Sequence, residues 1–175
     1  MAKGKSSADD VRTHVEISKS LYDDVLGRPA NPGDANSVID RAATIGENLR
    51  DGYMKPQYAL RKNMASTPEG HAAIDKTLAS LGMSLKPTPD KLRAKIIENL
   101  ATGKSLDSVR SELAGNKAVT DPMATTFNNG FSRPISGPEM NAAIEAMRSG
   151  KSPSDVVREW SRIKKSGGSL ENLFP

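Results

Sequence analysis

The chain contains no cysteine and few aromatic residues, with one Trp, three Tyr and three Phe among 175 residues. Without cysteine it forms no disulfide, no thiolate zinc site and no cysteine nucleophile. Only two imidazoles, those of His14 and His71, are present to act as bases or metal ligands, and they lie far apart in the sequence. These absences exclude disulfide-stapled and thiolate–metal proteins, and we expect no cofactor and no bound metal.

The chain also lacks long apolar runs. No stretch approaches the roughly 18–20 apolar residues that cross a bilayer. The first ten residues include lysines, but no apolar segment follows them, so no Sec signal peptide is predicted. We expect the chain to be cytoplasmic at synthesis. Export by a specialised secretion system is left open, because composition does not reveal such signals.

Large apolar side chains are scarce, since Leu, Ile, Val and Phe make up only 33 of the 175 residues. That share is typical of disorder when the net charge is high, but here the formal net charge is only +4. We therefore expect a modest folded core. The length of the chain suits one domain with tails.

Residues that start and stop helices recur along the chain. Apolar residues follow the 3.6-residue period between them, and no segment alternates as a strand does. The prediction is an all-α bundle of about seven or eight short helices. The expected helices span residues 8–26, 34–51, 56–64, 67–81, 88–102, 105–113, 138–149 and 153–165.

Residues 116–138 lack a helical period and carry prolines together with Asn128-Asn129-Gly130. We predict an irregular loop here, pinned to the core by Phe127 and Phe131, and such loops are often functional or mobile. The expected organisation is a flexible N-terminal tail, a single helical domain and a flexible C-terminal tail. In residue numbers these are 1–7, 8–165 and 166–175, with a possible division of the domain into 8–115 and 138–165 joined by 116–137.

Two segments of the sequence resemble each other. Residues 97–109 align without gaps on residues 144–156, and 47–52 is a weaker third copy. Each of the two clear copies has a helix end, a glycine, a lysine and a serine that can cap the next helix. Two tight helix corners would need the same residues, which is the simpler interpretation. The alternative is a duplicated helical hairpin.

The tripeptide Gly-Lys-Ser occurs twice but does not fit a phosphate-binding loop. Such a loop needs another glycine five residues before the first, and those positions hold Glu98 and Glu145. His71 lies on an apolar stripe and His14 beside acidic residues, which is ordinary for structural histidines. No nucleophile motif is present, and we predict no catalytic residue.

The net charge is concentrated between residues 148 and 165, where six basic and two acidic residues lie. Arg158, Arg162 and Lys165 share one face of the expected helix, opposite Trp160. This face is interpreted as a solvated outer surface, as a docking face for nucleic acid or an acidic protein, or, least favoured, as a membrane-surface helix. Aromatic residues are not interleaved with the charges, so nucleic acid would be held through its phosphates.

The tail after Ser166-Gly-Gly-Ser169 ends in apolar residues, including Leu173 and Phe174. It is either a tethered peptide that docks on a partner or a segment that folds back on the bundle.

These patterns favour a non-enzymatic helical module that binds a protein partner, such as an adaptor, a secreted effector or a phage or plasmid accessory protein. The alternative is a sequence-independent nucleic-acid-binding protein that uses the basic C-terminal helix, and an enzyme without a recognisable motif is third. The oligomeric state is not predicted. The expected contact residues are Lys151, Arg158, Arg162, Lys164, Lys165, Phe127, Phe131, Leu173 and Phe174.

Overall fold

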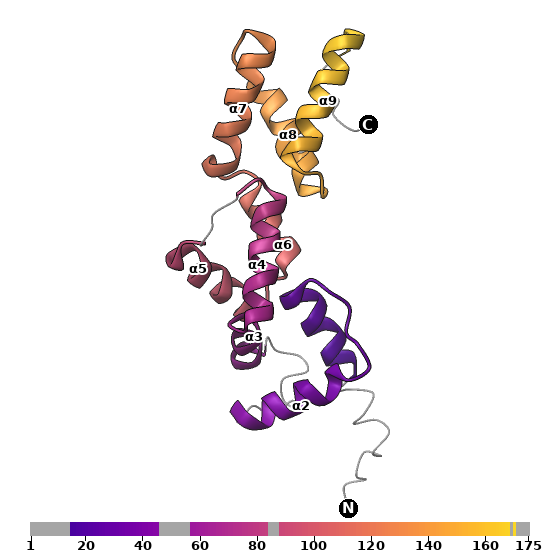
Figure 1. Ribbon diagram of the computed structural model, residues 1–175, viewed down its shortest axis with the longest axis vertical. Coiled ribbons are helices and arrows are strands. Elements are labelled where there is room, and N and C mark those ends of the chain that lie inside the picture. The colour runs from indigo at the N-terminus through magenta and orange to yellow at the C-terminus, as the bar shows by residue number, and fades with distance from the viewer. Residues whose placement is uncertain (1–14, 46–56, 84–87, 169, 171–175) are drawn as a thin grey trace, which may run out of the picture. The chain divides into compact units, whose positions relative to one another are not determined.

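A computed structural model describes residues 15–45, 57–83, 88–168 and 170, and this part of the chain contains helices and connecting segments but no strand (Figure 1). Residues 15–21 are α-helical and lead directly into a π-helical turn. The all-α prediction is thereby confirmed. The predicted tail 1–7 lies outside the described residues, and so do residues 169 and 171–175 of the predicted tail 166–175, whereas Ser166 belongs to the last helix. The elements are η1 (Tyr22–Leu26), α2 (Asp34–Ile45), α3 (Tyr58–Ala65), α4 (Pro68–Ser80), α5 (Asp90–Ala101), α6 (Leu106–Leu113), α7 (Lys117–Phe131), α8 (Gly137–Arg148) and α9 (Pro153–Ser166).

Local side-chain caps explain where several of these helices begin. The Thr67 hydroxyl accepts a hydrogen bond from the Gly70 N–H at 3.1 Å at the start of α4. The Ser152 hydroxyl accepts one from the Asp155 N–H at 3.1 Å at the start of α9. Such caps satisfy N–H groups that have no partner within the helix. The predicted boundaries of these helices are therefore close to the observed ones.

The prediction of an irregular loop over 116–138 is wrong, because α7 occupies most of it. The Asn116 side chain caps this helix by accepting from the Ala118 N–H at 2.9 Å. Pro122 lies inside the helix and removes one main-chain hydrogen bond, yet the helix continues to Phe131. The helix buries Phe127 on its apolar face, and this packing outweighs the poor local propensity.

Contacts between residues divide the described chain into two compact units. The first contains the described residues of 1–74 and 89–107, and the second contains those of 75–88 and 108–175. The division falls within α4 and α6, so each of these helices contributes to both units. Whether the chain is a single domain over 8–165 stays a prediction.

Each unit contains one of the two similar corners, and the two corners have the same backbone conformation. In the first unit Gly103 has φ 104°, and the Lys104 N–H donates to the Asn99 carbonyl at 3.1 Å. In the second unit Gly150 has φ 108°, and Lys151 repeats the bond, also at 3.1 Å. This left-handed geometry favours glycine and closes the helix end.

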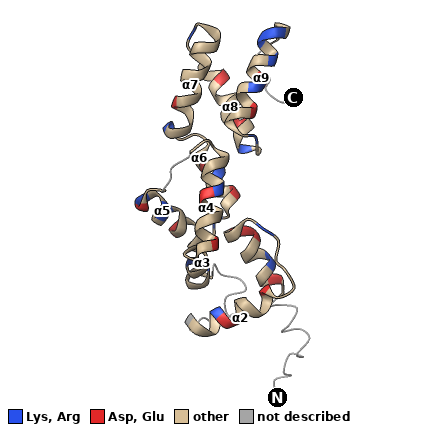
Figure 2. Cartoon of the chain, in the orientation of Figure 1, with Lys and Arg blue, Asp and Glu red and all other residues tan. Residues whose placement is uncertain are grey.

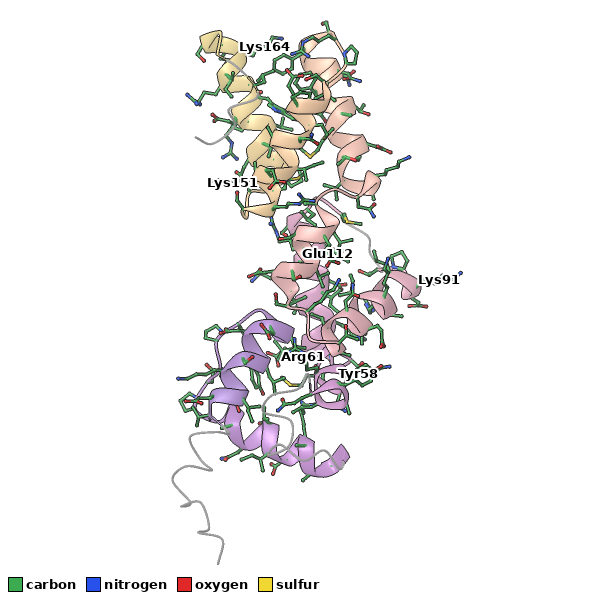
Figure 3. The ribbon with its side chains drawn as sticks, turned by 180° about the vertical axis from the view of Figure 1, so that it is seen from behind. Tyr58, Arg61, Lys91, Glu112, Lys151 and Lys164 are labelled. Atoms are coloured by element: carbon green, nitrogen blue, oxygen red, sulfur yellow. The ribbon has the colours of Figure 1, made fainter. Side chains whose placement is uncertain are left out.

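An arginine from another helix binds each corner. In the first unit Arg61 of α3, labelled in Figure 3, donates to the carbonyl oxygens of Leu100 at 2.6 Å and Lys104 at 2.7 Å. In the second unit Arg110 of α6 donates to the carbonyl oxygens at the equivalent positions. We call this arrangement the arginine clamp. The acceptors of the second clamp are Met147 and Lys151.

The resemblance of the two units extends beyond the corners. In the first unit Arg61 also reaches Asp24, near the end of the first helix, at 3.1 Å. In the second unit Arg110 reaches Ser80, at the end of α4, at 3.1 Å. Both units are thus built on one arrangement of a helix end, a short helix with a clamp arginine, and a helix corner. The similarity therefore extends from the corners to the clamp helices, and a duplicated hairpin stays the alternative interpretation of the two segments.

Candidate partner-binding site

Helix α9 has one buried and one exposed face, as its periodicity predicts. Val156, Trp160 and Ile163 are 0%, 1% and 5% exposed. The Arg158 side chain lies on the other face and is 79% exposed. Burial of Trp160 fixes the orientation of the helix, so its charged residues face outward.

Acidic residues of the same helix neutralise part of this charge. Arg158 lies 3.4 Å from Asp155, and Arg162 lies 2.5 Å from Glu159. Figure 2 shows where basic residues occur along α9. The hydrogen bond from Arg162 lowers the pKa of the Glu159 carboxyl and raises the pKa of the guanidinium. Lys165 is exposed and forms no ion pair with a described residue. The basic face is therefore weaker as an anion-binding surface than its sequence indicates.

Two further predicted contact residues, Lys151 and Lys164, lie at opposite ends of α9 (Figure 3). The Lys151 carbonyl oxygen accepts a bond of the second arginine clamp. The Lys164 ammonium donates to the Gly130 carbonyl oxygen, and its nitrogen lies 5.1 Å from the centre of the Phe131 ring. Lys164 thus ties α9 to the end of α7.

The two phenylalanines of α7 pack against α9 in place of the expected loop. The Phe127 and Phe131 rings stack with centroids 4.3 Å apart, and Trp160 meets Phe127 edge-on at 5.0 Å. Aromatic pairs at these separations stabilise the fold by more than the burial of their apolar surface alone would. Phe127 is 1% exposed, so its side chain serves the core and does not face a partner. Phe131 is half-buried.

Arg133 covers this aromatic cluster and forms an ion pair with Glu139. Its guanidinium carbon lies 5.0 Å from the Phe127 ring centre, and its terminal nitrogens bind the carboxylate at 2.5 and 2.9 Å. This bidentate bond, helped by the Ser136 N–H, lowers the pKa of Glu139 to about 2. The pair fixes the start of α8 beside the end of α7.

The C-terminal segment is described only in part. Leu170, after the glycines that end α9, is 8% exposed and therefore packs against the protein. Leu173 and Phe174, which were predicted as contact residues, lie outside the described residues. Burial of Leu170 agrees with a segment that folds back at this point.

An apolar groove lies between α7 and the start of α9. Its volume is about 310 Å³. Ala118 and Pro122 of its lining are exposed, and Val157 is half-buried. The complete lining is Leu81, Gly82, Ala118, Val119, Pro122, Met123, Thr126, Pro153, Ser154 and Val157. The lining contains no charged side chain, so the groove suits apolar groups of a ligand or partner.

Among the described residues, no group of three or more His, Asp or Glu side chains is arranged to hold a metal ion. His71 is half-buried, and His14 lies outside the described residues. None of the described helices has both the length and the apolar character needed to cross a membrane.

Comparison of the chain with known protein families, with curated proteins and with solved structures gives no match.

Sequence reasoning missed the groove and the arginine clamps. The sequence analysis did not single out Val157, and no periodicity shows that its neighbours leave a groove open. The sequence does contain a signal for the clamps, because Leu60-Arg61 and Val109-Arg110 lie at matching positions before two of the short connections. Extending the comparison of similar segments to the short helices would have found them.

Proposed function

We propose that the chain is a non-enzymatic helical module that binds a protein partner, and that the α7–α9 groove is its contact surface. The groove carries this proposal because it is lined by apolar, partly exposed side chains of two packed helices. Concave, mainly apolar surfaces are where proteins most often bind ligands or partners. Pro122 and Val157 are both part of its lining.

The pairing of charges on α9 supports a protein partner over nucleic acid. Arg158 and Arg162 already pair with acids on their own helix, and Lys164 binds α7. A nucleic acid would have to compete with these partners. Sequence-independent nucleic-acid binding remains the second candidate because Arg158 is 79% exposed and Lys165 is exposed as well.

A matched pair of threonines on α7 provides the test. Thr125 and Thr126 are both exposed, and each hydroxyl donates to the carbonyl four residues earlier at 3.0 Å. Only Thr126 lines the groove. Partners are captured from source lysate, with and without nuclease, on wild type, Thr126→Glu and the control Thr125→Glu.

The expected result is a protein partner that resists nuclease, is retained by Thr125→Glu and is lost by Thr126→Glu. A nuclease-sensitive catch that the variant Arg158/Arg162/Lys165→Glu loses would favour nucleic acid instead. In that case binding would also fall steeply with salt, because each neutralised phosphate releases counterions.

A further inference from the structure

Pro122 leaves a main-chain hydrogen-bond acceptor beside the α7–α9 groove. In an α-helix each carbonyl oxygen accepts from the N–H four residues later, but Pro122 has no N–H to donate to the carbonyl of Ala118. That carbonyl points along the helix axis from Ala118 towards Pro122, and both residues line the groove. The acceptor therefore lies on the strip of α7 that borders the groove.

The threonines of α7 do not replace the missing donor. Each of the three donates its hydroxyl hydrogen to the carbonyl four residues earlier, and none of these carbonyls is that of Ala118. Ala118 is exposed, so water can reach its carbonyl oxygen in the free protein. A ligand that displaces this water loses affinity unless it supplies a donor of its own.

The lining of the groove restricts which donor is suitable. It contains no charged side chain, so an ammonium or guanidinium group would lose its hydration there without gaining a counter-charge, which is costly. An amide or a phenol would bring a donor together with oxygen lone pairs that need partners. The indole of tryptophan combines a large apolar surface with one N–H donor and no acceptor. It would satisfy the Ala118 oxygen and leave no polar group of its own unpaired.

The size of the groove suits one large side chain. Its volume of about 310 Å³ is at the lower end of the range of roughly 300–1,000 Å³ for ligand pockets. Tryptophan is also enriched among the residues that contribute most to protein interfaces. The single tryptophan of this chain, Trp160, is 1% exposed and packs against Phe127. The indole therefore has to come from another protein.

From these observations we infer that the α7–α9 groove binds a tryptophan side chain of the partner, whose indole N–H donates to the carbonyl oxygen of Ala118. This inference rests on the proposed protein-binding function and names the side chain that the groove receives. Pro122 removes a hydrogen bond from α7 and thereby provides the acceptor.

Indole and 1-methylindole test the hydrogen bond on the full-length protein. The probes differ by one methyl group, which replaces the N–H hydrogen. Their dissociation constants are measured from the amide chemical shifts of Thr126 and Val157, in wild type and in Pro122→Ala. Pro122→Ala supplies an N–H to the Ala118 carbonyl and so removes the free acceptor. Val157→Ala is the matched control, because it removes apolar lining but leaves the acceptor free.

Indole should bind the wild-type protein about fivefold more tightly than 1-methylindole, the effect of one hydrogen bond. This ratio should fall below about twofold in Pro122→Ala. In Val157→Ala both probes bind more weakly, but the ratio stays near its wild-type value. In source lysate, excess indole should lower the capture of the protein that Thr126→Glu loses, and 1-methylindole should lower it less.

Other outcomes overturn the inference and the proposed function separately. Equal binding of the two probes to wild type, a preference that persists in Pro122→Ala, or no chemical-shift change with either probe overturns the inference. The proposed function still stands in these cases if Thr126→Glu loses a protein partner. Indole binding that leaves the capture of this protein unchanged overturns the partner's tryptophan as the occupant. If Thr126→Glu loses no protein, the proposed function falls, and with it the partner as the source of the indole.

Discussion

The guanidinium Nε–H of Arg61 donates to the carbonyl oxygen of Leu100 over 2.6 Å, at the C-terminal end of α5. Arg61 is only 5% exposed, so its charge is held away from water. Its other nitrogens bind Asp24 at 3.1 Å and the Lys104 carbonyl at 2.7 Å. A buried charge is tolerated when its hydrogen bonds are satisfied in this way.

Replacing Arg61 by methionine should therefore destabilise the protein. The change leaves the buried Leu100 carbonyl, the partly buried Lys104 carbonyl and the Asp24 carboxylate without their donor, and breaking a largely buried charged network of this kind costs about 2–4 kcal/mol. Urea unfolding followed by circular dichroism measures the loss. The control is Arg41→Met, since Arg41 binds only the exposed side chain of Asn63 among its described contacts. A loss below about 0.5 kcal/mol for Arg61→Met would contradict a structural role.

The second arginine clamp should stabilise the α8–α9 corner against local opening. Arg110 is only partly buried, so Arg110→Met should cost less, about 1–3 kcal/mol. Its effect should be concentrated where its acceptors lie, and amide hydrogen exchange at Gly150 and Lys151 should accelerate. Exchange at the equivalent amides, Gly103 and Lys104, serves as the internal reference. Equal acceleration at both corners would show that the clamp does not act locally.

The sequence predicts those elements whose determinants lie within one helix turn. Thr67 and Ser152 each cap a helix through an N–H three residues away, so a short window contains both partners. The Arg162–Glu159 pair likewise follows from helical spacing. These features need no knowledge of the tertiary structure.

The remaining features depend on contacts between distant residues. Helix α7 was predicted as a loop because Pro122 disfavours a helix locally, whereas packing of Phe127 on Trp160 stabilises it from another part of the chain. The acceptors of Arg61 lie 39 and 43 residues away, beyond any spacing rule. The groove exists because the packing of the helices leaves Val157 partly exposed. A sequence pattern does not show which residues the folded chain leaves uncovered.

Helix α7 can be tested by removing its proline. Pro122 lies inside the helix, where it cannot donate to the carbonyl four residues earlier, that of Ala118. Pro122→Ala restores that bond and should raise the free energy of unfolding by about 1–3 kcal/mol. Thermal unfolding measures the change, with Pro134→Ala in the connection before α8 as the control. Unchanged or lower stability would mean that the proline ring contributes packing that offsets its backbone cost.

The Arg133–Glu139 pair predicts how stability depends on pH. The bidentate bond from Arg133 lowers the pKa of Glu139 to about 2, whereas an unfolded glutamate titrates near 4.3. The folded state therefore binds this proton less readily than the unfolded state. The resulting stabilisation is complete above about pH 5 and is lost as the pH falls towards 2.

Glu139→Gln should remove this dependence. Because Glu139 is 6% exposed but the Arg133 side chain is 47% exposed, the expected loss at pH 7 is about 2 kcal/mol after allowance for solvent screening. The difference in unfolding free energy between wild type and variant should shrink between pH 5 and 2. Glu145→Gln is the control, since its carboxylate is 67% exposed and pairs with Arg148 at the surface. A difference that stays constant over this range would show that Glu139 acts through the shape of its side chain, because only a charge contribution vanishes when the carboxylate is protonated.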